Sequence, residues 1–272
     1  KLVTLMHKLT KLFWAYFLVS TLLSLDLLSQ EIIHISDEGN ISEKTAVVIL
    51  NGFGDTRKNR KHQTKYFETL EYDFFIPKYK VRKSLDASVE KFSDFYKAQN
   101  LHLYKEVKVI CYIIGGYVLN QHIENQGFGN IKTIIYDRSP IQERAPKVVV
   151  DKIKLISILM IGKVIKQFSE AENLPLKSTP GVNVGLIIEN KATPLMRFFK
   201  KTSNGYGPYN FNPSLIDPNL DDYFHTRLNH DEMYYRFDLI GPEIEYFLEN
   251  GAFTDEAKRQ IYSWDMFEKY EE

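Results

Sequence analysis

Cysteine is nearly absent from this chain of 272 residues, which has only Cys111. A single thiol excludes an intramolecular disulfide and a metal site built from cysteines alone. An excess of either charge is absent too, because 35 lysine and arginine side chains balance 35 aspartate and glutamate side chains. Without a basic field to hold a phosphate backbone, nucleic acid is not an expected partner.

Glycine and proline are also scarce, at 14 and 10 residues, which excludes a collagen-like or low-complexity chain. What the chain has instead is the composition of a folded protein, with 44% hydrophobic, 14% aromatic and 26% charged residues. It shows no internal repeat and no linker that would divide it. We therefore expect residues 31–272 to form one domain.

The first 30 residues differ from the rest, because three lysines precede an apolar run from Leu12 to Leu25 that ends at Asp26. A positive start before an apolar stretch of about 7 to 15 residues is typical of a secretory signal. The run is shorter than the roughly 20 residues of a membrane-spanning helix. Residues 1–30 are expected to be a signal peptide or an N-terminal anchor, which implies a secreted, periplasmic or membrane-associated protein. The alternative is an amphipathic first helix packed on the domain of a cytoplasmic protein.

Short apolar runs alternate with longer helical patterns through the rest of the chain, which predicts crossover units and a parallel sheet. Most of these runs are apolar at successive positions, as in strands that are covered on both faces. The expected fold class is therefore α/β, with a mostly parallel sheet flanked by helices. The expected strands are residues 46–50, 73–77, 107–114, 133–136 and 184–188, and the expected helices are residues 84–98, 115–126, 147–168, 242–250 and 255–268.

Four short segments, in this order along the chain, resemble the α/β-hydrolase family. The first is the glycine turn Asn51-Gly52-Phe53-Gly54. In that family the corresponding His-Gly-x-Gly turn contributes backbone amides to an oxyanion hole, so the resemblance assigns this role to Gly52, Phe53 and Gly54. Asn51 stands where the family has histidine, and an ordinary turn after a strand is the other interpretation. The resemblance also implies a helical cap, formed by residues 138–181, over the carboxyl ends of the strands.

The second segment, Cys111-Tyr112-Ile113-Ile114-Gly115-Gly116, corresponds to the Gly-x-Ser-x-Gly turn that carries the nucleophile. Aligned on its glycine pair, it places Ile113 at the nucleophile position. A hydrocarbon side chain cannot attack a carbonyl, and shifting the alignment by one residue brings Tyr112 or Ile114 to that position. The turn is therefore a degenerate nucleophile elbow.

The third and fourth segments correspond to the family's acid and base. The resemblance places Asn190 where an aspartate orients the catalytic histidine, and it places His230 in the late histidine loop. An amide accepts a hydrogen bond from imidazole but cannot stabilise imidazolium with a full charge. Glu189 could replace Asn190, although neighbouring residues of a strand project to opposite faces. The other interpretation of the third segment is a helix start, with Thr193 as its cap.

Two functions follow from these assignments. The leading one is a protein with the α/β-hydrolase fold but without catalysis, which binds a small-molecule ligand. The alternative is a hydrolase of esters or amides that uses a non-standard nucleophile such as Ser139, with His230 as base. No cofactor is expected. No metal site is expected either, because His225 and His230 of the acidic loop are five residues apart and do not share a helix face.

Overall fold

The computed structural model describes residues 30–37, 39–172 and 174–269. The predicted signal or anchor, residues 1–30, therefore lies outside the described residues except for Gln30. Within the described part, none of the helices combines the length and the apolar character that crossing a bilayer requires.

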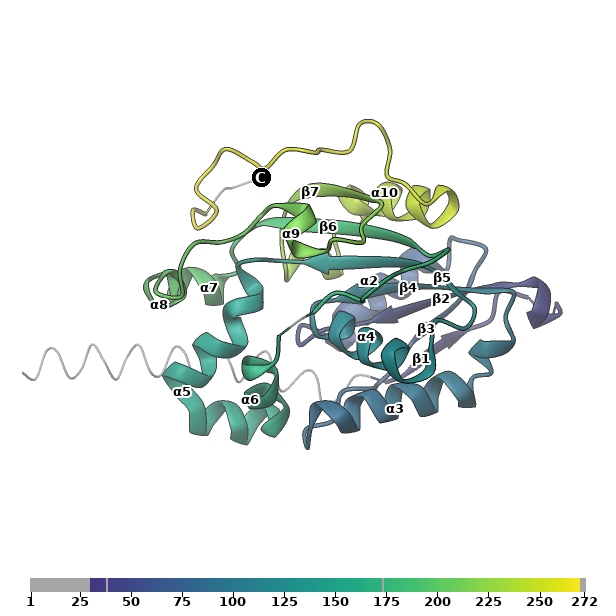
Figure 1. The fold of residues 1–272 in the computed structure, drawn as a ribbon, viewed down its shortest axis with the longest axis horizontal. Helices are drawn as coiled ribbons and strands as arrows, with labels where there is room; N and C mark the ends of the chain where they lie inside the picture. Colours follow the sequence, from purple (N-terminus) through teal and green to yellow (C-terminus); the bar gives the residue numbers. More distant parts are fainter. Residues whose placement is uncertain (1–29, 38, 173, 270–272) are drawn as a thin grey trace, which may run out of the picture.

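A seven-stranded sheet forms the centre of the described part, with the strand order β1-β3-β2-β4-β5-β6-β7. The β1 strand is antiparallel to β3, and all other neighbouring strands are parallel, which confirms the predicted α/β fold class (Figure 1). The strands are β1 (Ile32–His34), β2 (Thr45–Leu50), β3 (Asp73–Ile76), β4 (Glu106–Tyr112), β5 (Ile131–Arg138), β6 (Asn183–Lys191) and β7 (Asp222–Asn229).

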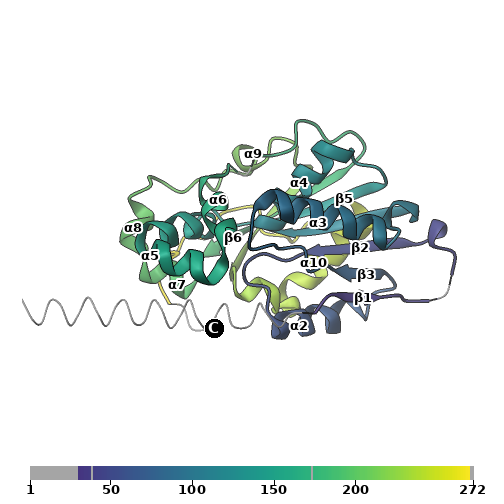
Figure 2. The same cartoon turned by 90° about the horizontal axis from the view of Figure 1, so that it is seen from below.

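Helices cover both faces of this sheet. The helices are α2 (Arg57–Phe67), α3 (Leu85–Ala98), α4 (Ile114–Gln126), α5 (Ala145–Ile161), α6 (Lys163–Glu170), α7 (Pro194–Phe198), α8 (Lys200–Asn204), α9 (Pro213–Ile216) and α10 (Phe237–Asn250). Figure 2 shows α3 and α4 on one side of the strands and α2 and α10 on the other. Side chains of β2 pack on both faces of the sheet: Val48 contacts the core formed with α3 and α4, and Val47 contacts the core formed with α2 and α10.

Two helices fill most of the segment between β5 and β6, where the cap was expected. Helix α5 follows a short 3-10 helix, η4 (Gln142–Arg144), and is interrupted at Ile153, whose φ of −142° and ψ of 41° are not helical. Gly162 separates α5 from α6 with a φ of 101°, a conformation that glycine adopts without steric cost. Both helices lie beyond one end of the sheet (Figure 1).

The carboxyl-terminal part of the chain differs from its prediction. Residues 255–268 are not helical, and strand β7 was not predicted at all. The non-helical segment runs along the sheet instead: the His225 amide donates to the Lys258 carbonyl at 2.7 Å, and the Ala192 amide donates to the Met266 carbonyl at 2.7 Å. Backbone groups of this segment thus find their partners on β7 and just after β6 rather than within a helix.

Candidate functional site

The glycine turn follows β2 directly and is anchored to α2 by a buried pair of amides. Asn51 donates to the Gln63 side-chain oxygen at 2.8 Å, and Gln63 donates back to the Asn51 oxygen at 2.7 Å. Tyr79 holds the same residue through a hydroxyl bond to the Asn51 carbonyl at 2.6 Å. Asn51, which replaces the histidine of the resemblance, therefore has a structural role at the base of the turn.

A buried ion pair fixes the other end of the turn. The guanidinium of Arg60 binds Asp55 through two hydrogen bonds of 2.7 Å and also donates to the Ile76 carbonyl at 2.6 Å. Burial on its own would raise the pKa of Asp55, but Lys80 and Arg60 together lower it below its usual value. Arg60 is thus engaged inside the protein and is not available to bind an external anion.

The second turn has the shape of a nucleophile elbow, a strand joined to a helix through one residue. That residue is Ile113, with a φ of 18° and a ψ of −81°, between the end of β4 and the start of α4. Gly115 allows the start of α4 to lie close to the end of β2, because a Cβ atom at this position would lie 2.1 Å from the Leu50 carbonyl oxygen. Cys111 is fully buried within β4, and burial raises the pKa of its thiol. Ile113, which the resemblance assigns to the nucleophile position, thus presents a hydrocarbon side chain between β4 and α4.

His230 lies in the loop after β7 and meets two carboxylates from the ends of neighbouring strands. Its Nδ1 is 2.7 Å from Oε1 of Glu189, at the end of β6, and 3.3 Å from Oδ2 of Asp137, at the end of β5. All three side chains are buried. Asp137 was not among the predicted site residues, although an aspartate one position beyond the expected strand 133–136 was a signal for it.

Asn190 points away from this cluster. Its side-chain amide lies 3.0 Å from Nδ1 of His225, and its side-chain oxygen accepts from the Tyr262 amide at 3.0 Å. The following helix starts as the alternative interpretation described, since the Thr193 hydroxyl caps α7 by accepting from the Met196 amide. The structure thus brings Glu189 to His230 and separates Asn190 from it.

The two carboxylates determine where protons reside in the cluster. Burial, followed by repulsion from Asp137, raises the pKa of Glu189 well above its usual value. Burial opposes a charge on His230, but attraction to Glu189 and Asp137 outweighs it and raises the pKa of the imidazole well above its usual value. Both shifts favour the protonated forms of Glu189 and His230.

The same three residues are the group in the described part that could hold a metal ion, since their ligand atoms lie within 4.8 Å of one another. Bonds of about 2.0–2.2 Å to a tetrahedral zinc ion would keep neighbouring ligand atoms roughly 3.4 Å apart. The 2.7 Å between His230 Nδ1 and Glu189 Oε1 is shorter and is the distance of a charge-assisted hydrogen bond. The geometry therefore favours protons over a metal ion here.

Tyr234 occupies the space between the glycine turn and the imidazole. Its hydroxyl accepts a hydrogen bond from the Gly52 amide at 3.0 Å and lies 3.4 Å from Nε2 of His230. Its ring stacks on Tyr112, with ring centroids 4.3 Å apart. A Cβ atom on Gly54 would lie 2.6 Å from this ring, so the second glycine of the turn makes room for it. Sequence analysis did not predict this position for Tyr234.

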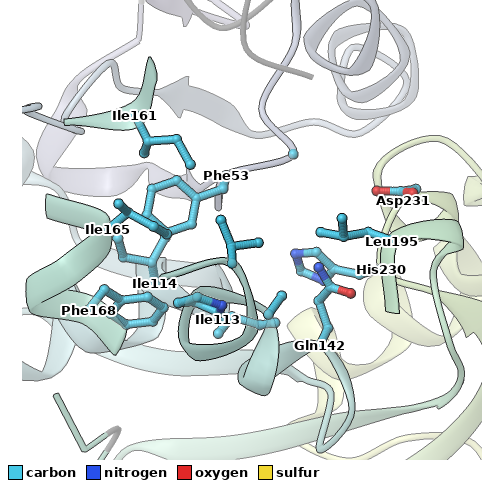
Figure 3. A pocket seen from close by; sticks show the side chains of 14 residues that line it. Phe53, Ile113, Ile114, Gln142, Ile161, Ile165, Phe168, Leu195, His230 and Asp231 are labelled. Carbon is cyan, nitrogen blue, oxygen red and sulfur yellow. The ribbon is translucent and has the colours of Figure 1, made fainter. Parts of the chain in front are cut away.

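A cavity of about 100 Å³ adjoins the two turns and the histidine. Its lining is apolar toward α6 and polar toward His230, Gln142 and Asp231, with Ile113 between these two ends (Figure 3). The helices α5 and α6 form one wall of it. The lining residues are Phe53, Gly54, Ile113, Ile114, Gln142, Ala145, Pro146, Val149, Ile161, Ile165, Phe168, Leu195, His230 and Asp231.

Ser139, the alternative nucleophile, is fully buried at the start of the segment that leads to η4. Its hydroxyl accepts a hydrogen bond from the Gln142 amide at 3.2 Å. Among the hydrogen bonds of the described residues there is none between Ser139 and His230, and Ser139 does not line the cavity. Its hydroxyl is therefore shielded from a bound molecule.

Comparison with known proteins gives no match to a family model and none to a curated protein. Among solved structures, the chain is similar to Est1E from Butyrivibrio proteoclasticus, with a TM-score of 0.53 and 8% identity over 81% of this chain and 93% of that one. It is also similar to MGS-MChE2, an alpha/beta hydrolase enzyme from the metagenome of sediments from the lagoon of Mar Chica, Morocco, with a TM-score of 0.49 and 17% identity over 80% and 94% of the two chains. At 8% identity the likeness to Est1E shows the fold alone, and the chain has the α/β-hydrolase fold that the resemblance predicted.

Proposed function

We propose that this protein binds a small apolar molecule in the cavity beside His230 and does not hydrolyse it. The observation that carries the proposal is Ile113, which stands between β4 and α4 where the fold presents a nucleophile and which lines the cavity. An acyl-enzyme needs an oxygen or sulfur atom at that point to bond to the carbonyl carbon. Isoleucine offers neither, so a bound acyl compound meets only a hydrocarbon surface there.

The protonation of His230 supports the same function. In a catalytic triad the imidazole begins neutral and takes the proton of the nucleophile, while one carboxylate orients it. Here a second carboxylate, from Asp137, adds to Glu189 and favours the imidazolium. A histidine that already holds its second proton cannot act as a general base, but it donates a strong hydrogen bond to an acceptor on a ligand.

The size and lining of the cavity define the ligand class. An engineered apolar cavity of about 150 Å³ in another protein accommodates benzene, so about 100 Å³ suits a short acyl chain or a small ring. The apolar end near Phe168 would take this hydrocarbon part, and His230 would meet an oxygen acceptor at the other end. Short-chain carboxylic acids and their esters have this combination.

The alternative, a hydrolase with a non-standard nucleophile, has one observation in its favour. The Tyr234 hydroxyl lies 3.4 Å from His230 Nε2 and accepts a hydrogen bond from the Gly52 amide. As a nucleophile it would have to give its proton to an imidazole that is already protonated, and burial raises its own pKa well above the usual value. The ring is also fully buried and does not line the cavity. These features make Tyr234 a poor nucleophile.

The test combines catalysis and binding on the purified full chain. We expect no turnover of p-nitrophenyl acetate or butyrate and no labelling by a fluorophosphonate probe. We expect calorimetry to detect binding of butyrate, and we expect Ile165→Trp to weaken it at least tenfold by filling the apolar end of the cavity. Turnover that is lost in His230→Ala or Tyr234→Phe would overturn the proposal in favour of the hydrolase.

A matched control separates a filled cavity from a damaged fold. Leu215 lies on α9 and is 71% exposed, so Leu215→Trp adds the same indole outside the cavity. This variant should bind butyrate as the wild type does. Equal binding by the wild type and Ile165→Trp would show that the ligand lies elsewhere.

A further inference from the structure

The outer side of α5 carries two leucines that no other part of the described chain covers. Leu155 is 84% exposed and Leu159 is 76% exposed, and both lie after the interruption at Ile153. Because they are four residues apart on a helix, their side chains lie on one face, one turn apart. Exposed leucines are common singly, but a pair this exposed on one face is typical of a surface that contacts something apolar.

Four exposed lysines are close to these leucines in sequence, and the nearest acidic residues, Asp151 and Glu170, lie at the two ends of the stretch. Lys152, Lys154, Lys163 and Lys166 are exposed, and residues 152–169 contain no aspartate or glutamate. Of these lysines, Lys166 lies 3.5 Å from Glu170, the next acidic residue along α6. We call Leu155, Leu159 and these four lysines the cap surface. It combines an apolar centre with a positive rim.

We propose that the cap surface docks on an anionic lipid bilayer. A helix with exposed leucines and flanking lysines inserts its apolar face at the boundary between headgroups and acyl chains, while its lysines bind anionic headgroups. The positive charge of the cap surface also argues against two other occupants, a second copy of this chain and residues 1–30. A second copy would bring the same lysines against each other, and residues 1–30 contribute three further lysines and one aspartate rather than the acidic groups that would neutralise the rim.

This docking would place the cavity close to the lipid. Ile161 and Ile165, on the same helices as the cap surface, point into the cavity from the other side. A short apolar compound could then pass between the bilayer and the cavity through the space around these helices. The docking itself depends only on the cap surface and holds whether or not the cavity binds a ligand.

The experiment is sedimentation of the full chain with two kinds of vesicles, phosphatidylcholine alone and equal parts of phosphatidylcholine and phosphatidylglycerol. We expect binding to the mixed vesicles that falls with added salt, and much weaker binding to phosphatidylcholine alone. The double variant Leu155→Ser with Leu159→Ser should bind mixed vesicles at least tenfold more weakly. Each lysine near an anionic surface raises partitioning about fivefold, so Lys152→Gln with Lys154→Gln should lower binding to mixed vesicles by about 25-fold.

Controls distinguish this contact from the other occupants. Leu215→Ser removes an equally exposed leucine on α9 and should bind vesicles as the wild type does. Because every variant retains residues 1–30, equal sedimentation of the wild type and the double leucine variant would place the membrane contact outside the cap surface and overturn the proposal. A dimer in gel filtration that the double leucine variant converts to a monomer would overturn it too, in favour of a second copy.

Discussion

Oδ2 of Asp137 lies 3.3 Å from Nδ1 of His230, the nitrogen that Glu189 already binds at 2.7 Å. One imidazole nitrogen thus faces two buried carboxylates from adjacent strands, whereas a catalytic triad uses one. The second carboxylate, from Asp137, contributes to the raised pKa of His230. In the proposed function, the hydrocarbon side chain of Ile113 and the raised pKa of His230 would both disfavour acyl transfer.

A serine at the elbow should restore hydrolysis only if the imidazole can also lose its proton. We expect Ile113→Ser alone to hydrolyse p-nitrophenyl acetate slowly and only at alkaline pH, because the raised pKa of His230 keeps the base protonated at neutral pH. Adding Asp137→Asn removes one of the charges that raise this pKa, so the rate profile should move to lower pH. The measurement is the pH dependence of kcat/KM for both variants. Identical profiles would show that Asp137 does not control the proton on His230.

Stability should decrease on the alkaline side. Because folding raises the pKa of both Glu189 and His230, their protonated forms stabilise the fold, and that contribution is lost as pH rises through the raised values. We expect the midpoint of thermal unfolding to fall as pH rises above 4.5, the usual pKa of glutamate, and further above 6.5, that of histidine, and to fall less in Glu189→Gln, which has no proton to lose there. An equal slope in the wild type and the variant would contradict this assignment.

His122 should reduce stability on the acid side. Burial lowers its pKa from 6.5 to about 4, so the unfolded chain binds a proton that the folded chain excludes. Stability should therefore decrease as pH falls from 6.5 toward 4, by about 2 kcal/mol at about pH 5 from this group. Denaturant titrations at neutral and acid pH should show a smaller difference for His122→Gln than for the wild type. His225, whose pKa is also lowered to about 4, should add to the loss in both proteins.

The ion pair below the glycine turn should be costly to break from one side. Asp55→Asn would leave the buried Arg60 without its carboxylate, and breaking a buried pair in this way costs about 3 to 5 kcal/mol. Replacing both partners, in Asp55→Asn with Arg60→Met, should restore part of the loss because no unpaired charge remains. Urea unfolding of the two single variants and the double variant measures the coupling. A double variant whose loss equals the sum of the two single losses would show no coupling between these side chains.

The sequence predicted the sheet well where strands are covered on both faces. Strands β2, β4 and β6 are mostly apolar, and their predicted bounds lie close to the observed ones. Strand β7 was missed because it begins at Asp222 and contains His225, Thr226 and Arg227, a polar composition that resembles the loop before it. Its strand conformation depends on pairing with β6 and on the carboxyl-terminal segment, which are contacts distant in sequence.

The sequence suggested candidate residues for the site, and the fold determines which of them lie together. The position of Ile113 at the elbow followed from the glycine pair, because Gly115 is needed where the helix passes the Leu50 carbonyl. Whether Glu189 or Asn190 reaches His230 depends on the direction of each side chain at the end of β6. The pairing with β7 becomes irregular there, so the sequence alone does not predict these directions. Asp137 approaches His230 from the end of β5, and Tyr234 does so from four residues further along the chain, contacts that depend on the fold.

The segment after α10 lies along the outer edge of β7, where the His225 amide donates to the Lys258 carbonyl. An uncovered strand edge is a template on which another chain can add a strand. Residues 252–269 therefore cover an edge of β7 that would otherwise be exposed to solvent. Proteolytic removal of this stretch should expose the strand edge and favour association between molecules, so we expect the solubility of the protein to depend on its carboxyl-terminal segment.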